Sequence, residues 1–353
     1  MKIHVPRVRL SAKEYELLQQ LRGKEIESEE SHEALKNYCE ENQIPFTNVN
    51  HYWHKGKNFS LHVKNDLQPT YMEMRDDIIS EMKAYAPEYK TISRQSTNTD
   101  SHLFVVDPAD IHVGKLSKSF EVGAEYNAEI AVNRVNEGVE GLVQKSAGFS
   151  IDKILLIIGN DVLHTDNPKR TTTAGTSQDT DGMWYENFIK AKQMYVDIIE
   201  RLLSIADVHI VFNPSNHDYM SGFFLADSIY SWFAKCDNVT FDVSIVHRKY
   251  YKYHNNLIGS THGDGAKEAD LPLLMAHEAS EHWASCKHKY IYTHHLHHNR
   301  SKDYMGVNIQ IMRSPSEADA WHMKSGYAHA PKAVEAFLHH KIHGRIASFC
   351  HIF

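Results

Sequence analysis

The sequence has few cysteines and no long apolar segment. Its four cysteines lie far apart, at positions 39, 236, 286 and 350, and none forms a CxxC pair, so a disulfide framework is not indicated. No apolar run approaches the roughly 18 residues that a membrane crossing needs. The first ten residues, MKIHVPRVRL, lack the apolar stretch of a secretory signal. We therefore expect a reduced, cytoplasmic protein without a membrane partner.

The chain also has no excess of positive charge. Its 353 residues include 38 Lys and Arg against 45 Asp and Glu, which gives a formal net charge of −7. This balance argues against a surface that coats nucleic acid without specificity, although a local basic groove or metal ions would still hold phosphates. The hydrophobic share of 42% is that of a globular protein, and the length favours one large domain plus a smaller one.

Histidine is abundant, with 26 residues. It is the commonest metal ligand and the usual general acid or base near neutral pH, but surface usage alone would also explain a scattered excess. The positions of the histidines therefore have to decide between these explanations.

The first part of the chain has the pattern of a small helical domain. SAKEYELLQQLR and SHEALKNYCEENQ each begin with a serine at a helix N-cap position, a short helix is expected over IPFTNVNHYWHK, and NFSLHVK alternates as a strand does. This order resembles a winged helix-turn-helix, in which residues 47–54 would read a DNA groove. Three small helices that pack on one another give the same pattern, so DNA reading and plain helical packing both stay open.

A polar stretch separates this region from the rest of the chain. After a helix expected over DDIISEMKAYA comes PEYKTISRQSTNTDS, which has no periodicity and is interpreted as a linker. We therefore assign residues 1–98 to the helical, helix-turn-helix-like module with its linker, and residues 99–353 to a second domain.

The second domain alternates strands and helices. Strands are expected at HLFVVD, KILLII and VHIVFN, and helices near Glu125–Gln144, Trp184–Leu203 and Phe223–Ala234. Further strand-like runs follow at HRKYYKY, NNLIGST, KYIYTH and VNIQIM, with a closing hairpin of AVEAFLHHK and RIASFCHIF that turns at Gly344. The pattern predicts an α/β fold with helices on the faces of a sheet, and a mixed sheet in its later half.

Polar residues stand at the carboxyl ends of five of these strands. The strands are followed in chain order by DIH, GND, SNHD, THGD and HHLH. On a strand, Asp110 and His112 would point to the same side and could reach one ion. Any one cluster is explained as well by a turn or a surface histidine, but five in order, where open α/β sheets place their sites, indicate a metal centre.

As an ordered set, these motifs resemble those of the calcineurin-like metallophosphoesterases, over roughly residues 103–298. The N-terminal region, the insertion TTTAGTSQDTDGMW and the stretch WHMKSGY are similar to phage- and prophage-borne members and to the nuclease subunits of DNA double-strand-break repair complexes. The resemblance implies the family's four-layer αββα sandwich, preceded here by the small helical domain. It also implies phosphoester hydrolysis that depends on two metal ions.

The family's roles transfer to matching positions. Asp110, His112 and His297 fall on ligands of the first metal, and Asp161 falls on the carboxylate that bridges both. The second metal's remaining ligands fall on Asn216, His262 and His295. His217 matches the catalytic histidine, and Asp218 is expected to orient its imidazole.

The sequence departs from the family pattern at three glycines. Asn160 stands in place of the glycine that precedes the bridging aspartate. Ser215 stands in place of the glycine of GNHD, and His294 stands in place of the glycine of GHxH. The run HHLHH leaves the ligand choice open by one position, with His294 and His298 as the alternatives.

A ligand set of carboxylate, amide and imidazole groups without thiolate suits Mn²⁺, Fe, Zn²⁺ or Ni²⁺, and Mn²⁺ is our first expectation. Two such ions about 3.5–4 Å apart would lower the pKa of a bridging water, and the resulting hydroxide would attack phosphorus. His217 would then supply a proton or a hydrogen bond to the leaving oxygen.

The substrate is less defined. His164 and Asp166 follow the bridging aspartate as polar partners of the ligands, or as turn and surface residues, and His164, Lys169 and Arg170 are candidate substrate-binding residues. The loop DNPKRTTTAGTSQDTDGMW is long enough to be functional, or is solvated. Aromatic residues near the expected mouth would stack on bases, or belong to the core. They are Trp184, Tyr219, Phe223 and Phe224.

Three functions remain open. The first is a phosphodiesterase or exonuclease-like nuclease with DNA or RNA as partner. The second is a small-nucleotide phosphatase or cyclic-nucleotide phosphodiesterase, and the third is a non-catalytic DNA-binding regulator. A homo-oligomer is also left open.

Overall fold

The computed structural model describes residues 25–41, 51–55, 60–64, 86–94 and 100–353. The chain forms two compact units, Met1–Ser80 and Glu81–Phe353. Among the described helices, none combines the length and apolar character that a bilayer crossing requires.

The first unit contains a helix and a β-hairpin. Helix α2 (Glu25–Glu41) confirms the helix expected over SHEALKNYCEENQ, and β2 (Ser60–Lys64) confirms the expected strand. The groove-reading helix over residues 47–54 is wrong for residues 51–54, because they lie in β1 (His51–Lys55), which pairs antiparallel with β2. Tyrosine and tryptophan in HYWHK favour a strand, and the pairing settles it. Residues 47–50 and the helices expected over SAKEYELLQQLR and DDIISEMKAYA, except Ala86, lie outside the described residues.

The second unit contains a six-stranded sheet in the order β13-β12-β3-β4-β5-β6. Its parallel strands are β3 (His102–Asp107), β4 (Ile151–Gly159), β5 (Asp207–Asn213) and β6 (Val239–Asp242). The expected closing hairpin is β12 (Ala333–His340) with β13 (Gly344–Ile352), and β12 pairs antiparallel with β3.

A second sheet of five strands has the order β10-β11-β9-β8-β7 and is mixed, as predicted for the later half of the chain. Its strands are β7 (Lys249–Tyr253), β8 (Asn256–Ser260), β9 (His288–Thr293), β10 (Arg300–Tyr304) and β11 (Val307–Ile311). The sequence pattern missed β6 and β10.

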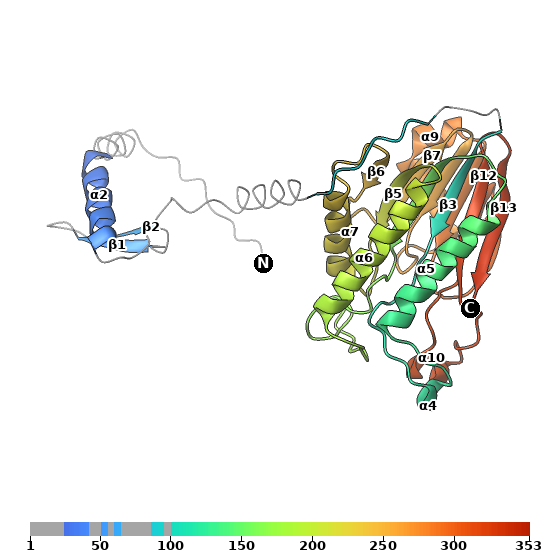
Figure 1. Cartoon of the computed structure of the whole chain (residues 1–353), viewed down its shortest axis with the longest axis horizontal. Coiled ribbons are helices and arrows are strands. Elements are labelled where there is room, and N and C mark those ends of the chain that lie inside the picture. Colours follow the sequence, from blue (N-terminus) through green and yellow to red (C-terminus); the bar gives the residue numbers. More distant parts are fainter. Residues whose placement is uncertain (1–24, 42–50, 56–59, 65–85, 95–99) are drawn as a thin grey trace. The chain divides into compact units, whose positions relative to one another are not determined.

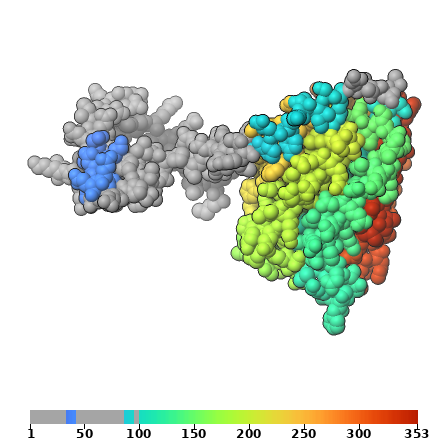
Figure 2. All heavy atoms as spheres, viewed as in Figure 1, coloured from blue at the N-terminus to red at the C-terminus, as the bar shows by residue number. Residues whose placement is uncertain are grey.

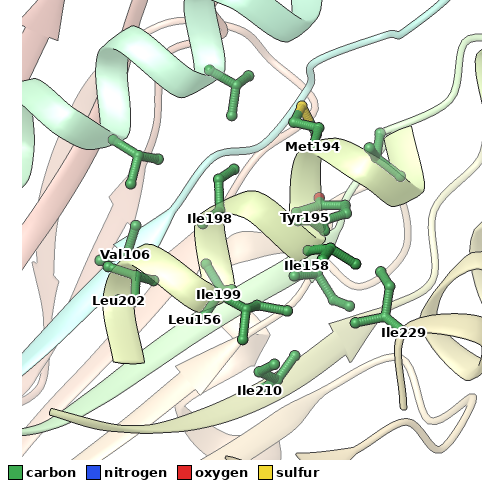
Figure 3. Close-up of a cluster of buried hydrophobic side chains, with 14 of the residues drawn as sticks. Val106, Leu156, Ile158, Met194, Tyr195, Ile198, Ile199, Leu202, Ile210 and Ile229 are labelled. Atoms are coloured by element: carbon green, nitrogen blue, oxygen red, sulfur yellow. The ribbon is translucent and has the colours of Figure 1, made fainter. Parts of the chain in front are cut away.

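Three helices cover the outer face of the six-stranded sheet: α5 (Ala128–Lys145), α6 (Trp184–Leu203) and α7 (Tyr219–Trp232). Figure 3 shows the contact, in which apolar side chains of α6 lie against residues such as Leu156 and Ile210 of the sheet. Apolar residues recur along α6 at helical spacing, and this pattern places one face of the helix in the core.

The two sheets pack against each other through their other faces. Along β3, Phe104 and Val106 face the helices, while Leu103 and Val105 contact residues of the second sheet such as Ile258, as the two-residue period of a strand requires. The outer face of the second sheet is covered by α8 (Leu271–Glu278) and α9 (Ser280–Ser285), which follow η2 (Glu268–Asp270). The unit is therefore a four-layer αββα sandwich.

Residues 87–94, which we assigned to a linker, are extended along the rest of the second unit (Figure 2). The Tyr89 ring stacks on Phe233 with a centroid distance of 5.2 Å, and its hydroxyl donates to Glu200 Oε1 at 2.7 Å. Arg94 forms an ion pair with Asp207. These contacts make the segment part of the sandwich.

The short helices α4 (Ser119–Val122) and α10 (Ala320–Ser325) lie at the same end of this unit, the end at which β3 finishes (Figure 1). The strands β3, β4, β5, β8 and β9 deliver the predicted polar motifs at this end.

Candidate metal centre

The polypeptide segments after β3 and β4 run side by side. The backbone N–H of Asp110 donates to the Asn160 carbonyl at 2.8 Å, and that of His112 donates to the Asp161 carbonyl at 2.9 Å. Asp110 and His112 both have a φ of 52°, so the expectation that they share one side of a strand is wrong. They follow the end of β3, and left-handed backbone conformations bring their side chains to a common point.

Backbone strain is concentrated at the predicted ligands. Among the described residues, nine that are not glycine have a positive φ, and six of these belong to the strand-end motifs. The six are Asp110, His112, Asn160, Asp161, His295 and His297. Such conformations cost about 1–3 kcal/mol each and persist where the surrounding structure enforces them, often at functional sites. Asn160, at a position where the pattern that the sequence resembles has glycine, has a φ of 53°, and asparagine tolerates this region better than most residues.

Three predicted ligands form one set. His297 Nε2 lies 3.4 Å from Asp110 Oδ1 and 3.4 Å from His112 Nε2. Asp110 and His112 are buried. Ligand atoms of all three residues lie within 4.8 Å of one another, close enough to hold one ion.

The other four predicted ligands form a second set around His262. Its Nε2 lies 3.0 Å from Asn216 Oδ1, 3.2 Å from Asp161 Oδ2 and 3.2 Å from His295 Nδ1. The sets are adjacent, because the His295 backbone N–H donates to Asp110 Oδ2 at 3.0 Å. The structure thus brings together all seven residues in the two groups that the resemblance implied.

The second set has more lone pairs than protons. A single ring nitrogen, His262 Nε2, carries at most one proton and faces the side-chain oxygens of Asn216 and Asp161 as well as His295 Nδ1. Among the described residues, the buried Nδ1 of His262 has no hydrogen-bond partner. A cation at the common point would satisfy the converging lone pairs together. Carboxylate, amide and imidazole donors are the ligands that Mn²⁺, Fe and Zn²⁺ accept, so these residues fit a divalent transition metal.

Electrostatics also suit a cation. Burial favours a raised pKa for Asp161, but the His262 imidazole outweighs it and lowers the pKa overall. Burial lowers the pKa of His262, but the Asp161 carboxylate raises it to about 9. A metal ion would therefore compete with a proton on His262. Burial depresses the pKa of His112 and His297, which keeps these imidazoles in the neutral form that metal ligands need.

The His217 imidazole lies beside the first set and is oriented by backbone. Its ring centroid is 4.6 Å from that of His112, and its Nδ1 lies 2.9 Å from the His164 carbonyl oxygen. An Nδ1–H that donates to this carbonyl leaves Nε2 free for substrate. The backbone N–H of His217 donates to Asp161 Oδ1 at 2.9 Å. Hydrogen bonds therefore hold both the backbone and the ring of His217 in place.

Asp218, expected to orient His217, has another role. Its Oδ1 accepts from Ser215 Oγ at 2.6 Å and its Oδ2 from the Leu163 backbone N–H at 2.8 Å. Ser215 Oγ in turn lies 2.7 Å from the backbone nitrogen of Asp161. Asp218 therefore braces the turn that carries Asp161, and the His164 carbonyl orients the imidazole.

His164 and Asp166, which follow Asp161, lie in different environments. His164 is buried, with Nδ1 3.3 Å from His112 Nδ1, and its ring stacks on His217. Asp166 instead caps α7, since its Oδ1 accepts from the backbone N–H groups of Met220 and Ser221 at 2.9 and 2.7 Å.

The candidate substrate-binding residues Lys169 and Arg170 do not belong to either ligand set. Lys169 and Arg170 are exposed, and Arg170 Nη2 lies 3.8 Å from Met183 Sδ. Of the aromatic candidates, Trp184 and Phe224 are about half exposed. The Phe223 side chain packs against the core.

The alternative histidine ligands are engaged elsewhere. His294 is buried, with Nε2 3.0 Å from Asp107 Oδ2. His298 is exposed, and its Nδ1 lies 2.9 Å from the Leu296 carbonyl oxygen.

Three residues near the centre were missed by the motif pattern. The His322 ring stacks on His297 with a centroid distance of 5.5 Å, and its Nδ1 lies 2.7 Å from Asp319 Oδ1. Asp319 Oδ2 lies 3.0 Å from the buried Lys115 Nζ. The spacing of Asp319 and His322 by three residues was the available signal for a helix start.

No known family model matches the sequence, and no curated protein does. Solved structures with a similar fold include Vps29 of Entamoeba histolytica in complex with Zn²⁺. It is 13% identical, with a TM-score of 0.31, over 71% of this chain and 98% of that one. They include an archaeal phosphodiesterase at 6% identity and a TM-score of 0.33 over 71% and 99%. A predicted phosphoesterase of Streptococcus pneumoniae matches at 10% identity and a TM-score of 0.29 over 73% and 100%. Values this low carry no functional weight, and the chemistry of the site has to be judged from its own residues.

Proposed function

We propose that the protein is a two-metal phosphoesterase of the calcineurin-like kind. The observation that carries this proposal is the convergence of seven predicted ligand side chains into two adjacent sets, from the ends of five separate strands. Ligands delivered by rigid strands and held in strained backbone conformations form a preorganised site.

In this proposal, Asp161 would be shared between the two ions. The other residues of the first set would hold one ion, and the other residues of the second set would hold the other ion. The ions, with Mn²⁺ as the first choice, would supply an activated water and neutralise charge on the phosphoryl oxygens. With both ring nitrogens protonated, His217 would donate from Nε2 to the leaving oxygen, while its Nδ1–H on the His164 carbonyl holds the ring in place. His164 contacts the first set through His112, and Lys115 pairs with Asp319, which holds the His322 ring that stacks on His297.

We further propose that the substrate is a nucleic acid and the reaction is phosphodiester cleavage. Aromatic side chains are exposed on the helices that follow two of the motif segments, including those of Trp184, the first residue of α6, and Phe224 in the second turn of α7. Exposed rings near a phosphate site are typical of enzymes that hold unpaired bases.

The direct test is a parallel assay on Mn²⁺-loaded protein. We expect cleavage of an aryl phosphodiester and of single-stranded DNA or RNA, and slower hydrolysis of phosphomonoesters, cyclic nucleotides and duplex DNA. A preference for cyclic nucleotides or monoesters would assign the site to small nucleotides instead. Loaded protein that hydrolyses none of these substrates would leave the DNA-binding regulator as the remaining function.

The role of the first unit is tested by its removal. A chain that starts at Glu81 retains residues 86–94 and their contacts with α6 and α7. We expect it to hydrolyse the aryl diester at nearly the full rate but to need a higher DNA concentration, with a weaker dependence on salt, because phosphate contacts add affinity and no chemistry. Steady-state kinetics at several salt concentrations measure both effects. Equal loss of both activities would contradict a separate binding role.

A further inference from the structure

Helix α10 and the turn after it expose two large aromatic side chains beside the metal centre. Trp321 is 62% exposed and Tyr327 is 65% exposed. Their ring centroids lie 5.9 Å apart with an interplanar angle of 36°. Two adjacent exposed aromatic rings form an apolar patch that is suited to binding.

The rings connect to the metal centre through contacts. The Trp321 indole lies edge to face on His322, with centroids 5.1 Å apart, and the His322 ring stacks on His297 at an interplanar angle of 17°. A continuous series of rings thus leads from a proposed metal ligand to Tyr327. A molecule whose phosphate lies at the metal centre would have its neighbouring groups within reach of these rings.

The segment is held rigidly to the strand-end loops that carry the ligands. Asp319 caps the helix by accepting from the His322 backbone N–H at 3.0 Å, and it also pairs with Lys115, whose side chain is 1% exposed. Ser314 Oγ donates to the Asp110 carbonyl at 2.7 Å. A surface with this support keeps its rings oriented and lowers the entropic cost of binding.

Charge around the rings suits a polyanion. Lys324 lies three residues after Trp321 on α10, and it forms no ion pair among the described residues. The nearest carboxylate on the segment, Asp319, is neutralised by Lys115 and hydrogen-bonded to His322. The exposed cation is therefore available to a phosphate, while the Asp319 carboxylate, which is 24% exposed, is already paired with Lys115.

We propose that Trp321 and Tyr327 form a stacking platform for the unpaired bases of a single-stranded nucleic acid whose phosphate lies at the metal centre. The proposal rests on the proposed function and specifies its substrate. Every base has a π-face, so the platform accepts bases without strong sequence preference. Trp321 contacts His322 edge to face, and Trp321 and Tyr327 are both more than half exposed, which leaves ring surface for the bases.

The test distinguishes binding of the nucleic-acid bases from binding of the sugar-phosphate backbone. Binding of Mn²⁺-loaded protein is measured by fluorescence anisotropy with labelled phosphorothioate hexamers of thymidine, of uridine and of an abasic sugar, whose linkages resist hydrolysis. We expect Trp321→Ala and Tyr327→Ala each to weaken binding of a base-bearing hexamer about 5- to 150-fold, and to change binding of the abasic hexamer less than about twofold. Trp321→Phe retains a stacking face and should restore most of the affinity.

The matched control is Tyr230→Ala, which removes a ring that is 38% exposed on α7 and should leave all hexamers unaffected. Equal weakening of base-bearing and abasic hexamers, or no weakening of either, would overturn the platform. Hydrolysis of an aryl phosphodiester is measured in parallel. If the wild type lacks it but still binds bases through Trp321, the proposed reaction fails while the platform stands; hydrolysis without base-dependent binding overturns the platform alone.

Discussion

Asp161→Asn should reduce phosphodiester hydrolysis by about 10³-fold or more. The carboxylate is buried, one oxygen lies 3.2 Å from His262 Nε2, and the other accepts from the His217 backbone N–H. In our proposal it is shared by both ions, so its loss removes several kcal/mol of charge stabilisation in the transition state. Asparagine keeps the shape but not the charge. We expect inductively coupled plasma mass spectrometry to find fewer than two ions per chain.

The control for this variant is Asp197→Asn, on the exposed face of α6, where Asp197 Oδ1 accepts from Gln193. It should retain full activity and metal content. An Asp161→Asn protein that keeps two ions and most of its activity would show that the carboxylate does not bridge a metal pair.

His217→Gln should lower the rate about 10²- to 10⁴-fold on a substrate with a poor leaving group while both metal ions remain bound. The side chain lies outside the seven proposed ligands, and its Nδ1 hydrogen bond to the His164 carbonyl aligns the ring for proton transfer. Glutamine keeps a similar bulk and a hydrogen-bonding end but cannot deliver a proton. An activated aryl ester needs little protonation, so we expect a smaller deficit on that substrate.

His298→Gln is the matched control, because His298 is exposed directly after His297 and, in our proposal, takes no part in the reaction. The metal content of each variant and its hydrolysis rate on substrates with good and poor leaving groups test this prediction. If His217→Gln loses an ion, or if its deficit is the same for both leaving groups, the proton donor must be another residue. His164, whose ring stacks on that of His217, would be the first to examine.

The sequence predicted the sandwich well because its elements are long or strongly patterned. Helix α6 was expected over the residues that it occupies, since 20 residues carry the helical period. The hairpin in the first unit was misassigned at residues 51–54, because strand pairing is not encoded in local periodicity. Strand β6 was missed because four residues give too short a pattern to recognise.

The composition of the site was predictable, and its geometry was not. Parallel strands end at one edge, so polar residues after them were expected to meet. The left-handed conformations of Asp110 and His112 arise from pairing with the segment after β4, which is a tertiary effect. For the same reason Asp218, adjacent to His217 in sequence, contacts Ser215 and not the imidazole. His322 reaches the centre from a helix that lies beyond the last motif.

The central claim is that two metal ions occupy the two ligand sets. Crystals soaked in Mn²⁺ and measured at the manganese absorption edge test it directly. We expect two anomalous peaks about 3.5–4 Å apart, one contacting Asp110, His112 and His297, the other contacting Asn216, His262 and His295, with Asp161 between them. The absence of peaks at this position, or a single ion held by other residues, would contradict the two-metal centre.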